Sequence, residues 1–319
     1  MRRPFGADAG RSGATTLCFP RITPPQSCAM ADEYKLVPLP NGTHAVHAAS
    51  YDEKMHPGLG PAAEAEALYV RQLKIRERMQ AHAGEFVVWD VGLGAAANAL
   101  TLLRLTRDLP GPLRLVSFDD TSGPLEFALA HPEELAYLRG YDATVRELIT
   151  NRSVTFNDGA RRVEWEFHLG DFPGLLAWAR QDARPTNERM AAPHATFFDA
   201  FSPAKNPAMW TLPVFTNLFH QLDPARPSSL TTYSRSTLIR ATLLRAGFFV
   251  GRGIPTGLKE ETTVAANTFT LLDAPLEKNW LERARRSDSA EPLRNPVYRR
   301  EKLSDETWAK LQAHPQFQP

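Results

Sequence analysis

The sequence predicts an α/β fold in which a mostly parallel sheet carries helices on both faces. Three observations favour it: a continuous apolar run at residues 86–89, a Gly-x-Gly turn directly after that run, and an alternation of strand-like and helix-like segments from about residue 85 onward. Strands that are apolar on both sides are typical of parallel sheets covered by helices. We therefore expect a Rossmann-like domain with a seven-stranded sheet.

Two elements should precede this domain. Asn41-Gly42 stands between two short extended runs, which predicts a small N-terminal β-hairpin. Residues 61–81 then have the period of an amphipathic helix that leads into the core. The apolar residues near one face of that helix are Ala65, Leu68, Ile75 and Met79.

The core elements follow in chain order. Strands are expected at 86–89, 113–118, 195–201, 229–233, 248–254 and 262–271, with a hairpin over 153–169 that turns at Asn157-Asp158-Gly159. Helices are expected at 95–105, 125–138, 173–181 and 206–222.

The chain has 319 residues, of which 43% are hydrophobic and 23% charged, as in ordinary globular proteins. We expect four parts: a leader at 1–29, a hairpin and helix at 30–84, the main domain at 85–275, and a basic C-terminal tail at 276–319. The leader lacks a core-forming pattern, and Met30 opens a sequence that resembles a natural start. An extended or mis-called start is the main interpretation, while a targeting segment and a functional tail stay open.

The charge and the cysteine content limit the partners, the compartment and the metal sites that the sequence can predict. The net charge is +1, so the whole chain carries no nucleic-acid signal, but residues 278–302 hold eight cations against four acids. That segment is either a basic patch or a solvated charged tail. No apolar run of 18 residues occurs, so no membrane span is expected. Both cysteines, Cys18 and Cys28, lie in the leader, which favours a reducing, cytoplasmic compartment and no metal site.

The first candidate site is the glycine turn after the first buried strand. Gly92 and Gly94 let the backbone approach a ligand closely, and Asp90 and Asn98 flank the turn. This pattern predicts binding of a nucleotide or of S-adenosylmethionine, with a tight structural turn as the alternative. Asp119 ends the second strand, where Rossmann-like folds place an acid that accepts hydrogen bonds from ribose hydroxyls. A helix cap is the alternative for the neighbouring Asp120 and, less so, for Asp119.

The most informative segment is ATFFDAFSPAKNPAMW at 195–210. Four apolar residues deliver Asp199 to the carboxyl end of a buried strand, and open α/β folds bind their ligands at such ends. A packing role explains Phe197 and Phe198. It does not explain why an acid and a Pro-Ala-Lys-Asn-Pro sequence follow the strand.

This segment closely resembles the signature of the methyltransferase domain of the tRNA-modifying MnmC family, Asp-Gly-Phe-x-Pro-x-Lys-Asn-Pro-x-Met-Trp. Only Ala200 departs from it. The resemblance extends over about residues 41–275 and includes the glycine turn, Ser117-Phe118-Asp119 and Gly170-Asp171. It implies a class I fold that binds S-adenosylmethionine and methylates the aminomethyl nitrogen of uridine 34 in certain tRNAs. Upstream tRNA-modifying enzymes would supply that aminomethyl group.

The resemblance also implies roles for individual residues. Asp199 is expected to orient the acceptor amine and, second, to act as its base. The expected cofactor-binding residues are Asp90, Gly92, Gly94, Asn98, Asp119, Asp171, Asp199 and Phe201. The expected substrate-binding residues are Pro203, Lys205, Asn206 and Trp210. Asp171 has an alternative role as the cap of the helix at 173–181.

Two departures from the family pattern matter. The segment at 51–70 differs from the bifunctional members, so the roles of Tyr51, Glu53 and His56 stay open. The sequence also contains no match to the FAD-dependent oxidase half of those enzymes, so neither FAD nor a metal is expected. The rival hypotheses are an enzyme of this fold that acts on a protein or small molecule, a non-catalytic RNA- or cofactor-binding protein, and a dinucleotide oxidoreductase.

Overall fold

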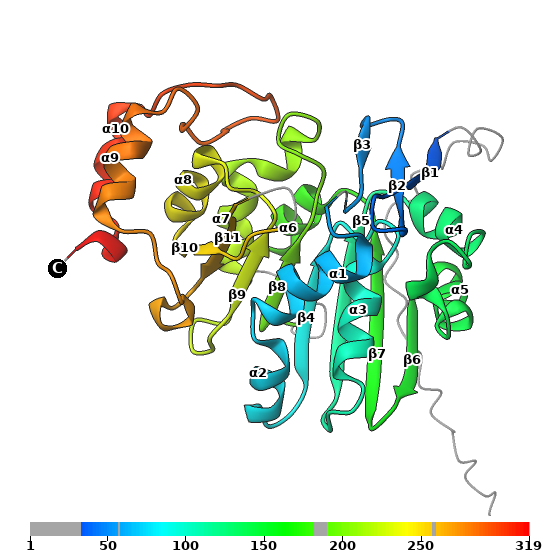
Figure 1. Ribbon diagram of the computed structural model, residues 1–319. Helices are drawn as coiled ribbons and strands as arrows, with labels where there is room; N and C mark the ends of the chain where they lie inside the picture. Colours follow the sequence, from blue (N-terminus) through cyan, green and yellow to red (C-terminus); the bar gives the residue numbers. More distant parts are fainter. Residues whose placement is uncertain (1–32, 57, 181–189, 257–259, 319) are drawn as a thin grey trace, which may run out of the picture.

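The computed structural model describes residues 33–56, 58–180, 190–256 and 260–318. The expected leader at 1–29, with both cysteines, lies outside the described residues. The central strands are β4 (Phe86–Val91), β5 (Leu113–Asp119), β6 (Ser153–Asp158), β7 (Arg161–Leu169), β8 (Ala195–Phe198), β9 (Ser229–Thr232), β10 (Phe249–Gly253) and β11 (Thr262–Ala266). They form one sheet in the order β10-β11-β9-β8-β4-β5-β7-β6 (Figure 1).

The sheet is parallel at its centre and antiparallel at both edges. β9, β8, β4, β5 and β7 run in parallel, while β6 pairs antiparallel with β7, and β11 pairs antiparallel with both β9 and β10. The fold class is therefore confirmed, but the sheet has eight strands and not seven. The six expected strands and the two arms of the hairpin at 153–169 account for all eight, so only the expected total of seven was wrong.

Helices cover both faces of this sheet. The longer ones are α3 (Ala97–Thr106), α4 (Gly123–Leu129), α5 (Asp142–Asn151), α6 (Phe172–Ala179), α7 (Leu212–His220) and α8 (Thr237–Ala246). Side chains of β4 alternate between two cores: Val88 packs in the core that contains α3, and Trp89 packs in the core that contains α7 and α8. Burial on both sides explains why β4 is apolar at nearly every position.

The expected hairpin is present as part of a small separate sheet. β1 (Tyr34–Pro38) pairs with β2 (His44–Ala48), and β2 also pairs with β3 (Glu53–Lys54). Gly42 has φ +82°, the left-handed conformation that glycine adopts without strain. Figure 1 shows this sheet at the end of the central sheet where its parallel strands finish.

The expected single helix at 61–81 is divided into three parts. They are α1 (Pro61–Ala65), a π-helical stretch η2 (Glu66–Arg71) and α2 (Ile75–Ala81). Lys74 has φ +50° and interrupts the helix before α2. The four apolar residues of the predicted face are all buried, so the pattern was correct although the helix is not continuous.

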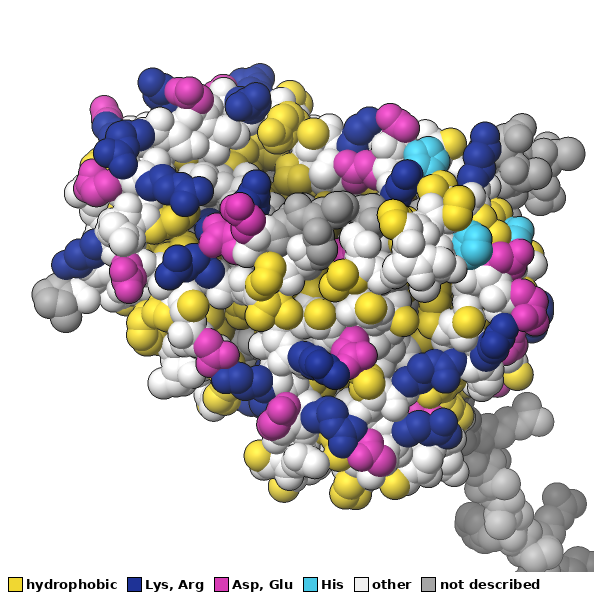
Figure 2. Space-filling view, viewed as in Figure 1, with side chains coloured by type: hydrophobic (Ala, Val, Ile, Leu, Met, Phe, Trp, Pro, Cys, Tyr) yellow, Lys and Arg dark blue, Asp and Glu magenta, His cyan; other side chains and the backbone are white. Residues whose placement is uncertain are grey.

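Residues 276–319 were expected as a basic tail, but the structure places two helices there. α9 (Lys278–Arg286) and α10 (Asp305–Gln312) pack on the α8 side of the sheet and bury Trp280, Leu281 and Leu311. Lys and Arg side chains lie on the outside of this region, at the upper left of Figure 2. The prediction of a tail was wrong because it rested on charge content and did not consider the apolar residues that recur on one face of α9. None of the helices among the described residues is long and apolar enough to cross a membrane.

Short helical turns complete the described part of the chain. They are η5 (Pro207–Trp210), η6 (Phe269–Leu271) and η7 (Pro315–Phe317). A further turn, η3 (Ala136–Leu138), separates α4 from α5, where the sequence had predicted one helix over 125–138.

Candidate active site

The predicted site residues meet where three parallel strands end. β4 lies between β5 and β8, and the register places Val91 beside both Phe118 and Phe198. The next residues along each chain segment are Gly92, Asp119 and Asp199. Segments that are 25 or more residues apart in sequence thus converge at one edge of the sheet.

The glycine turn lies directly against the end of β8. Gly92 has φ +91°, and a Cβ atom on it would lie 2.8 Å from the carbonyl oxygen of Asp199. Gly94 has φ +51°, and a Cβ atom there would lie 3.2 Å from Sδ of Met55. Gly92 is therefore required for conformation and for space, whereas at Gly94 the positive φ favours glycine and the flexible Met55 side chain could move aside.

Asp199 is held by two side chains from different elements. Nδ2 of Asn98, at the start of α3, donates a hydrogen bond of 2.8 Å to Oδ2 of Asp199. Nε2 of His56, which follows β3, lies 3.5 Å from the same oxygen. Asp199 retains 15% exposure of its side chain, so the carboxylate is oriented by the protein and is still accessible.

Two buried acceptors next to the glycine turn have no hydrogen-bond partner among the described residues. They are Oδ1 of Asp90 and Oδ1 of Asn98. Asp90 is fully buried, and its other oxygen accepts a hydrogen bond of 3.2 Å from Ser117. Burial raises the pKa of Asp90 well above its usual value, and the charges of Asp199 and Asp119 add to this effect. Unpaired buried acceptors are rare and indicate a ligand or water with donor groups.

Asp119 supports the glycine turn with its carboxylate. Oδ2 accepts a hydrogen bond of 2.8 Å from the amide of Gly94, and Oδ1 accepts one of 3.3 Å from the amide of Thr121. Burial raises the pKa of Asp119 to about 7, and the neighbouring charge of Asp120 acts in the same direction. The expected ribose-binding acid is thus at the glycine turn, as predicted from the strand order.

The small N-terminal sheet contacts the loop that follows Asp199. Glu53 accepts hydrogen bonds from the amide and the hydroxyl of Ser202, the first of them 2.9 Å long. The rings of Tyr51 and Phe201 are stacked, with centroids 4.1 Å apart. The hydroxyl of Tyr51 donates to Oδ2 of Asp120 at 3.4 Å. Tyr51, Glu53 and His56, whose roles the sequence left open, therefore connect this sheet to the candidate site.

The expected substrate-binding residues fall into two groups. Pro203 and Asn206 are half-buried in the loop, and Lys205 is exposed, with Nζ 3.8 Å from a carboxylate oxygen of Asp52. Trp210 is a correction: its indole is fully buried against Phe198 and cannot contact a substrate. Its Nε1 donates a hydrogen bond of 2.7 Å to the carbonyl oxygen of Phe201, so Trp210 positions the loop from inside.

Asp171 serves as the N-cap of α6. Its carboxylate accepts a hydrogen bond of 3.0 Å from the amide of Gly174, and the residue is exposed. This geometry agrees with the capping alternative. A contact between Asp171 and a cofactor stays a prediction.

The sequence did not single out Tyr69, which lies in the π-helical stretch. Its side chain is fully buried beside Phe197. Burial raises the pKa of Tyr69 well above its usual value, and the nearby charge of Asp199 adds to the shift. An aromatic residue with a polar tip on an otherwise apolar helical face was the available signal.

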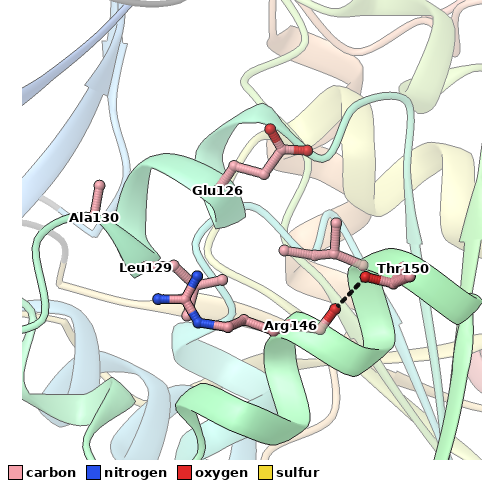
Figure 3. A pocket seen from close by; sticks show the side chains of 6 residues that line it. Glu126, Leu129, Ala130, Arg146 and Thr150 are labelled. Atoms are coloured by element: carbon pink, nitrogen blue, oxygen red, sulfur yellow. Dashed lines mark hydrogen bonds between the residues drawn. The ribbon is translucent and has the colours of Figure 1, made fainter.

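A separate surface pocket lies between α4 and α5. Figure 3 shows Arg146 of α5 opposite Glu126 and Leu129 of α4, with the hydroxyl of Thr150 bonded to the backbone of its own helix. None of these residues belongs to the cluster around Asp199. The cluster at the strand ends is therefore the stronger candidate for an active site.

Comparison with known proteins indicates the class of enzyme. Residues 177–268 match the model of a family described as S-adenosyl-L-methionine-dependent methyltransferase. The tRNA 5-methylaminomethyl-2-thiouridine biosynthesis bifunctional protein MnmC of Ectopseudomonas mendocina is 31% identical over 229 residues, 69% of this chain and 33% of that protein. MnmC of Ralstonia nicotianae is 29% identical over 243 residues, 71% of this chain and 33% of that protein.

The chain is an S-adenosyl-L-methionine-dependent methyltransferase related to the MnmC proteins. It spans about a third of the length of these curated relatives. The fold of this chain is also that of MNMC2 from Aquifex aeolicus, with a TM-score of 0.63, 22% identity, and coverage of 88% of this chain and 83% of the other.

Proposed function

We propose that this methyltransferase methylates the aminomethyl nitrogen on the wobble uridine of tRNA. The observation that carries the proposal is the placement of Asp199, which Asn98 and His56 orient at the start of the loop formed by residues 199–210. The curated relatives are named for tRNA 5-methylaminomethyl-2-thiouridine biosynthesis, which names the acceptor class. We limit the proposal to methyl transfer, without FAD or a metal.

The residues around the glycine turn fit S-adenosylmethionine. Gly92 and Gly94 leave backbone without side chains, and the orphaned oxygens of Asp90 and Asn98 can accept hydrogen bonds from a polar ligand. Asp119 would accept hydrogen bonds from ribose hydroxyls. The cofactor supplies a methyl group on a sulfonium, which is open to attack by a neutral amine. Phe201 and Asp171 complete the proposed cofactor contacts.

The acceptor amine must be neutral when it reacts. If it titrated like lysine, near pH 10.4, deprotonation at pH 7 would cost roughly 4 to 5 kcal/mol. Apolar surface from Phe201 and Pro203 would lower the pKa of the amine, while Asp199 would accept its hydrogen bond and direct its lone pair. Asp199 would then take up the proton that the amine releases as its new N–C bond forms and the methyl–sulfur bond breaks, which leaves the cofactor as a neutral thioether.

His56 is proposed to act through Asp199. Nε2 of His56 lies beside Oδ2 of Asp199, an oxygen that the amine would also approach. His56 therefore limits the orientations that the Asp199 carboxylate can take. Its φ of +54° is unusual for a residue other than glycine, and such strain is common where a side chain must be held for function. Lys205 and Asn206 would contact the tRNA substrate.

The reaction defines its place in a sequence of steps. Because the acceptor is a primary amine on a modified uridine, other tRNA-modifying enzymes must first install the aminomethyl group. We propose that the reaction takes place in the cytoplasm, where tRNA is modified.

The test is methyl transfer to a defined nucleoside. The protein is incubated with methyl-labelled S-adenosylmethionine and tRNA that carries the aminomethyl group but lacks the methyl group, and the RNA is then digested and the labelled nucleoside identified. The proposal predicts label in 5-methylaminomethyl-type uridine and none in tRNA whose wobble uridine lacks the aminomethyl group. Label in a protein or small molecule, with none in tRNA, would contradict it.

A further inference from the structure

An exposed loop near the C-terminus is cationic and carries an aromatic side chain. Nine consecutive residues, 294–302, are exposed between the buried Leu293 and Leu303. Their cations are Arg294, Arg299, Arg300 and Lys302, against the single acid Glu301. Two large hydrophobic residues of this loop are also exposed, Val297 to 52% and Tyr298 to 39%. We call residues 294–302 the cationic loop.

The cationic loop has a fixed base. The amides of Ala290 and Glu291 both donate to the carbonyl oxygen of Glu301, at 2.9 and 3.1 Å. The carboxylate of Glu291 accepts hydrogen bonds from the hydroxyls of Ser304 and Thr307, at 3.1 and 2.7 Å. The two ends of the loop are thus joined, as in the compact Ω-loops that often carry function. Its exposed side chains are presented by a closed structure and not by a loose tail.

The base of the cationic loop is joined to the loop of the active site. The amide of Leu212 donates a hydrogen bond of 2.7 Å to the carbonyl oxygen of Leu293. Thr211 and Leu293 also form a β-bridge. Thr211 directly follows the 199–210 segment that begins with Asp199. Figure 1 shows the chain between α9 and α10 running along the same end of the molecule as β2 and β3.

Arg294 is paired with Glu291 and Glu306, at 3.8 and 3.3 Å, whereas the charges of Arg299, Arg300 and Lys302 stay available for a ligand. Arg299 lies 3.8 Å from Glu301, and Lys302 lies 3.4 Å from Asp288. The two cationic side chains are 67% and 71% exposed. Exposed pairs of this kind contribute little and exchange readily for other anions. No ion pair of Arg300 is found among the described residues. An exposed aromatic ring flanked by arginines is a common way to bind single-stranded RNA, by base stacking and phosphate contacts.

We propose that the cationic loop binds the tRNA substrate, with Tyr298 stacking on an unpaired base and Arg299 and Arg300 contacting phosphates. This inference rests on the proposed function. An anticodon loop offers unpaired bases beside the wobble position, and the bond between Leu212 and Leu293 fixes the cationic loop relative to the active-site loop. The cationic loop would therefore hold the substrate while Asp199 engages the amine.

The test compares Tyr298→Ala and the double variant Arg299→Ala/Arg300→Ala with a control, Arg162→Ala. Arg162 is an exposed cation of β7 near the hairpin at the opposite end of the sheet. Affinity for unmodified tRNA is measured by fluorescence anisotropy at several salt concentrations, and affinity for S-adenosylmethionine by calorimetry.

We expect Tyr298→Ala to weaken tRNA binding about tenfold. The double variant should lower the slope of log affinity against log salt by about 1 to 2, as expected for one or two lost phosphate contacts. Both should keep wild-type cofactor affinity, and Arg162→Ala should bind tRNA as the wild type does. Unchanged tRNA affinity in both loop variants, while the wild type still methylates tRNA, would overturn this inference alone. A wild-type protein that neither binds nor methylates tRNA would overturn the proposed function with it.

Discussion

Nε2 of His56 lies 3.5 Å from Oδ2 of Asp199, and both side chains are largely enclosed, at 11% and 15% exposure. A second pair in the same region, His47 and Asp52, has the same separation of 3.5 Å, but Asp52 is 81% exposed. Water screens the exposed pair, whereas the enclosed pair can determine how the Asp199 carboxylate is oriented. The two pairs therefore form a matched comparison.

His56→Gln should lower kcat by roughly tenfold and leave the affinity for S-adenosylmethionine within about threefold of the wild-type value, because a positioning contact affects the reacting geometry. His47→Gln should keep wild-type kcat. Steady-state kinetics with tRNA that carries the aminomethyl group but not the methyl group, and calorimetry with the cofactor, measure both quantities. Equal kcat values for the two variants would show that His56 has no role in orienting Asp199.

Gly92→Ala should abolish tight cofactor binding, because a Cβ atom there would lie 2.8 Å from the carbonyl oxygen of Asp199. The backbone would have to move by several tenths of an ångström, and both the glycine turn and Asp199 would shift. Gly140→Ala is the control, since Gly140 has a similar φ of +85° and no atom within 4 Å of the added Cβ. Both variants carry the same backbone strain, so the difference between their cofactor affinities reports the close approach. Similar affinities would contradict the assignment of the turn.

The raised pKa of Asp119 predicts a pH dependence of stability. The folded protein keeps a proton on Asp119 up to about pH 7, whereas the unfolded chain releases it near pH 3.8. The free energy of unfolding therefore decreases between these two pH values, because the folded state binds more protons there. Asp119→Asn should remove this decrease, so the variant should gain stability relative to wild type as pH rises. Urea unfolding at about pH 4.5 and pH 8 measures the gain.

The same carboxylate should make cofactor binding depend on pH. Ionised Asp119 accepts hydrogen bonds from ribose more strongly than the protonated form does. Wild-type affinity for S-adenosylmethionine should therefore increase from about pH 6 to pH 8, and the Asp119→Asn variant should bind more weakly and without that increase. A pH-independent wild-type affinity would remove Asp119 from the ribose site.

Much of the fold could be predicted because its signals are local. The apolar run at Phe86–Val91 and the glycines after it indicated both a buried strand and the turn at its end. The hairpin of β6 and β7 was also predicted, because its turn at Asn157-Asp158-Gly159 is a local signal. Only the total of seven strands was wrong. Residues 276–319 were misjudged because eight cations concealed the spacing of Trp280, Leu281 and Ala284, which bury one face of α9.

Part of the candidate site could be predicted because the glycine turn and the strand ends also carry local sequence signals. Strand order brings Gly92, Asp119 and Asp199 to one edge, so these positions follow from topology. Contacts between the small N-terminal sheet and the loop at 199–210, such as that of Glu53 with Ser202, leave no repeating pattern in the sequence that could predict them. Trp210 was misassigned because a signature names the residues of a motif without showing which of them face inward.

The central claim is that Asp199 orients the acceptor amine and takes its proton. The decisive measurement is the single-turnover rate of methyl transfer by Asp199→Asn to tRNA that carries the aminomethyl group but not yet the methyl group, with cofactor affinity measured in parallel. We predict a rate lower by on the order of a hundredfold or more, partly recovered at high pH where the amine is already neutral, with cofactor affinity within about tenfold of wild type. An unimpaired rate would contradict the account, and a loss of cofactor binding instead would reassign Asp199 to the cofactor pocket.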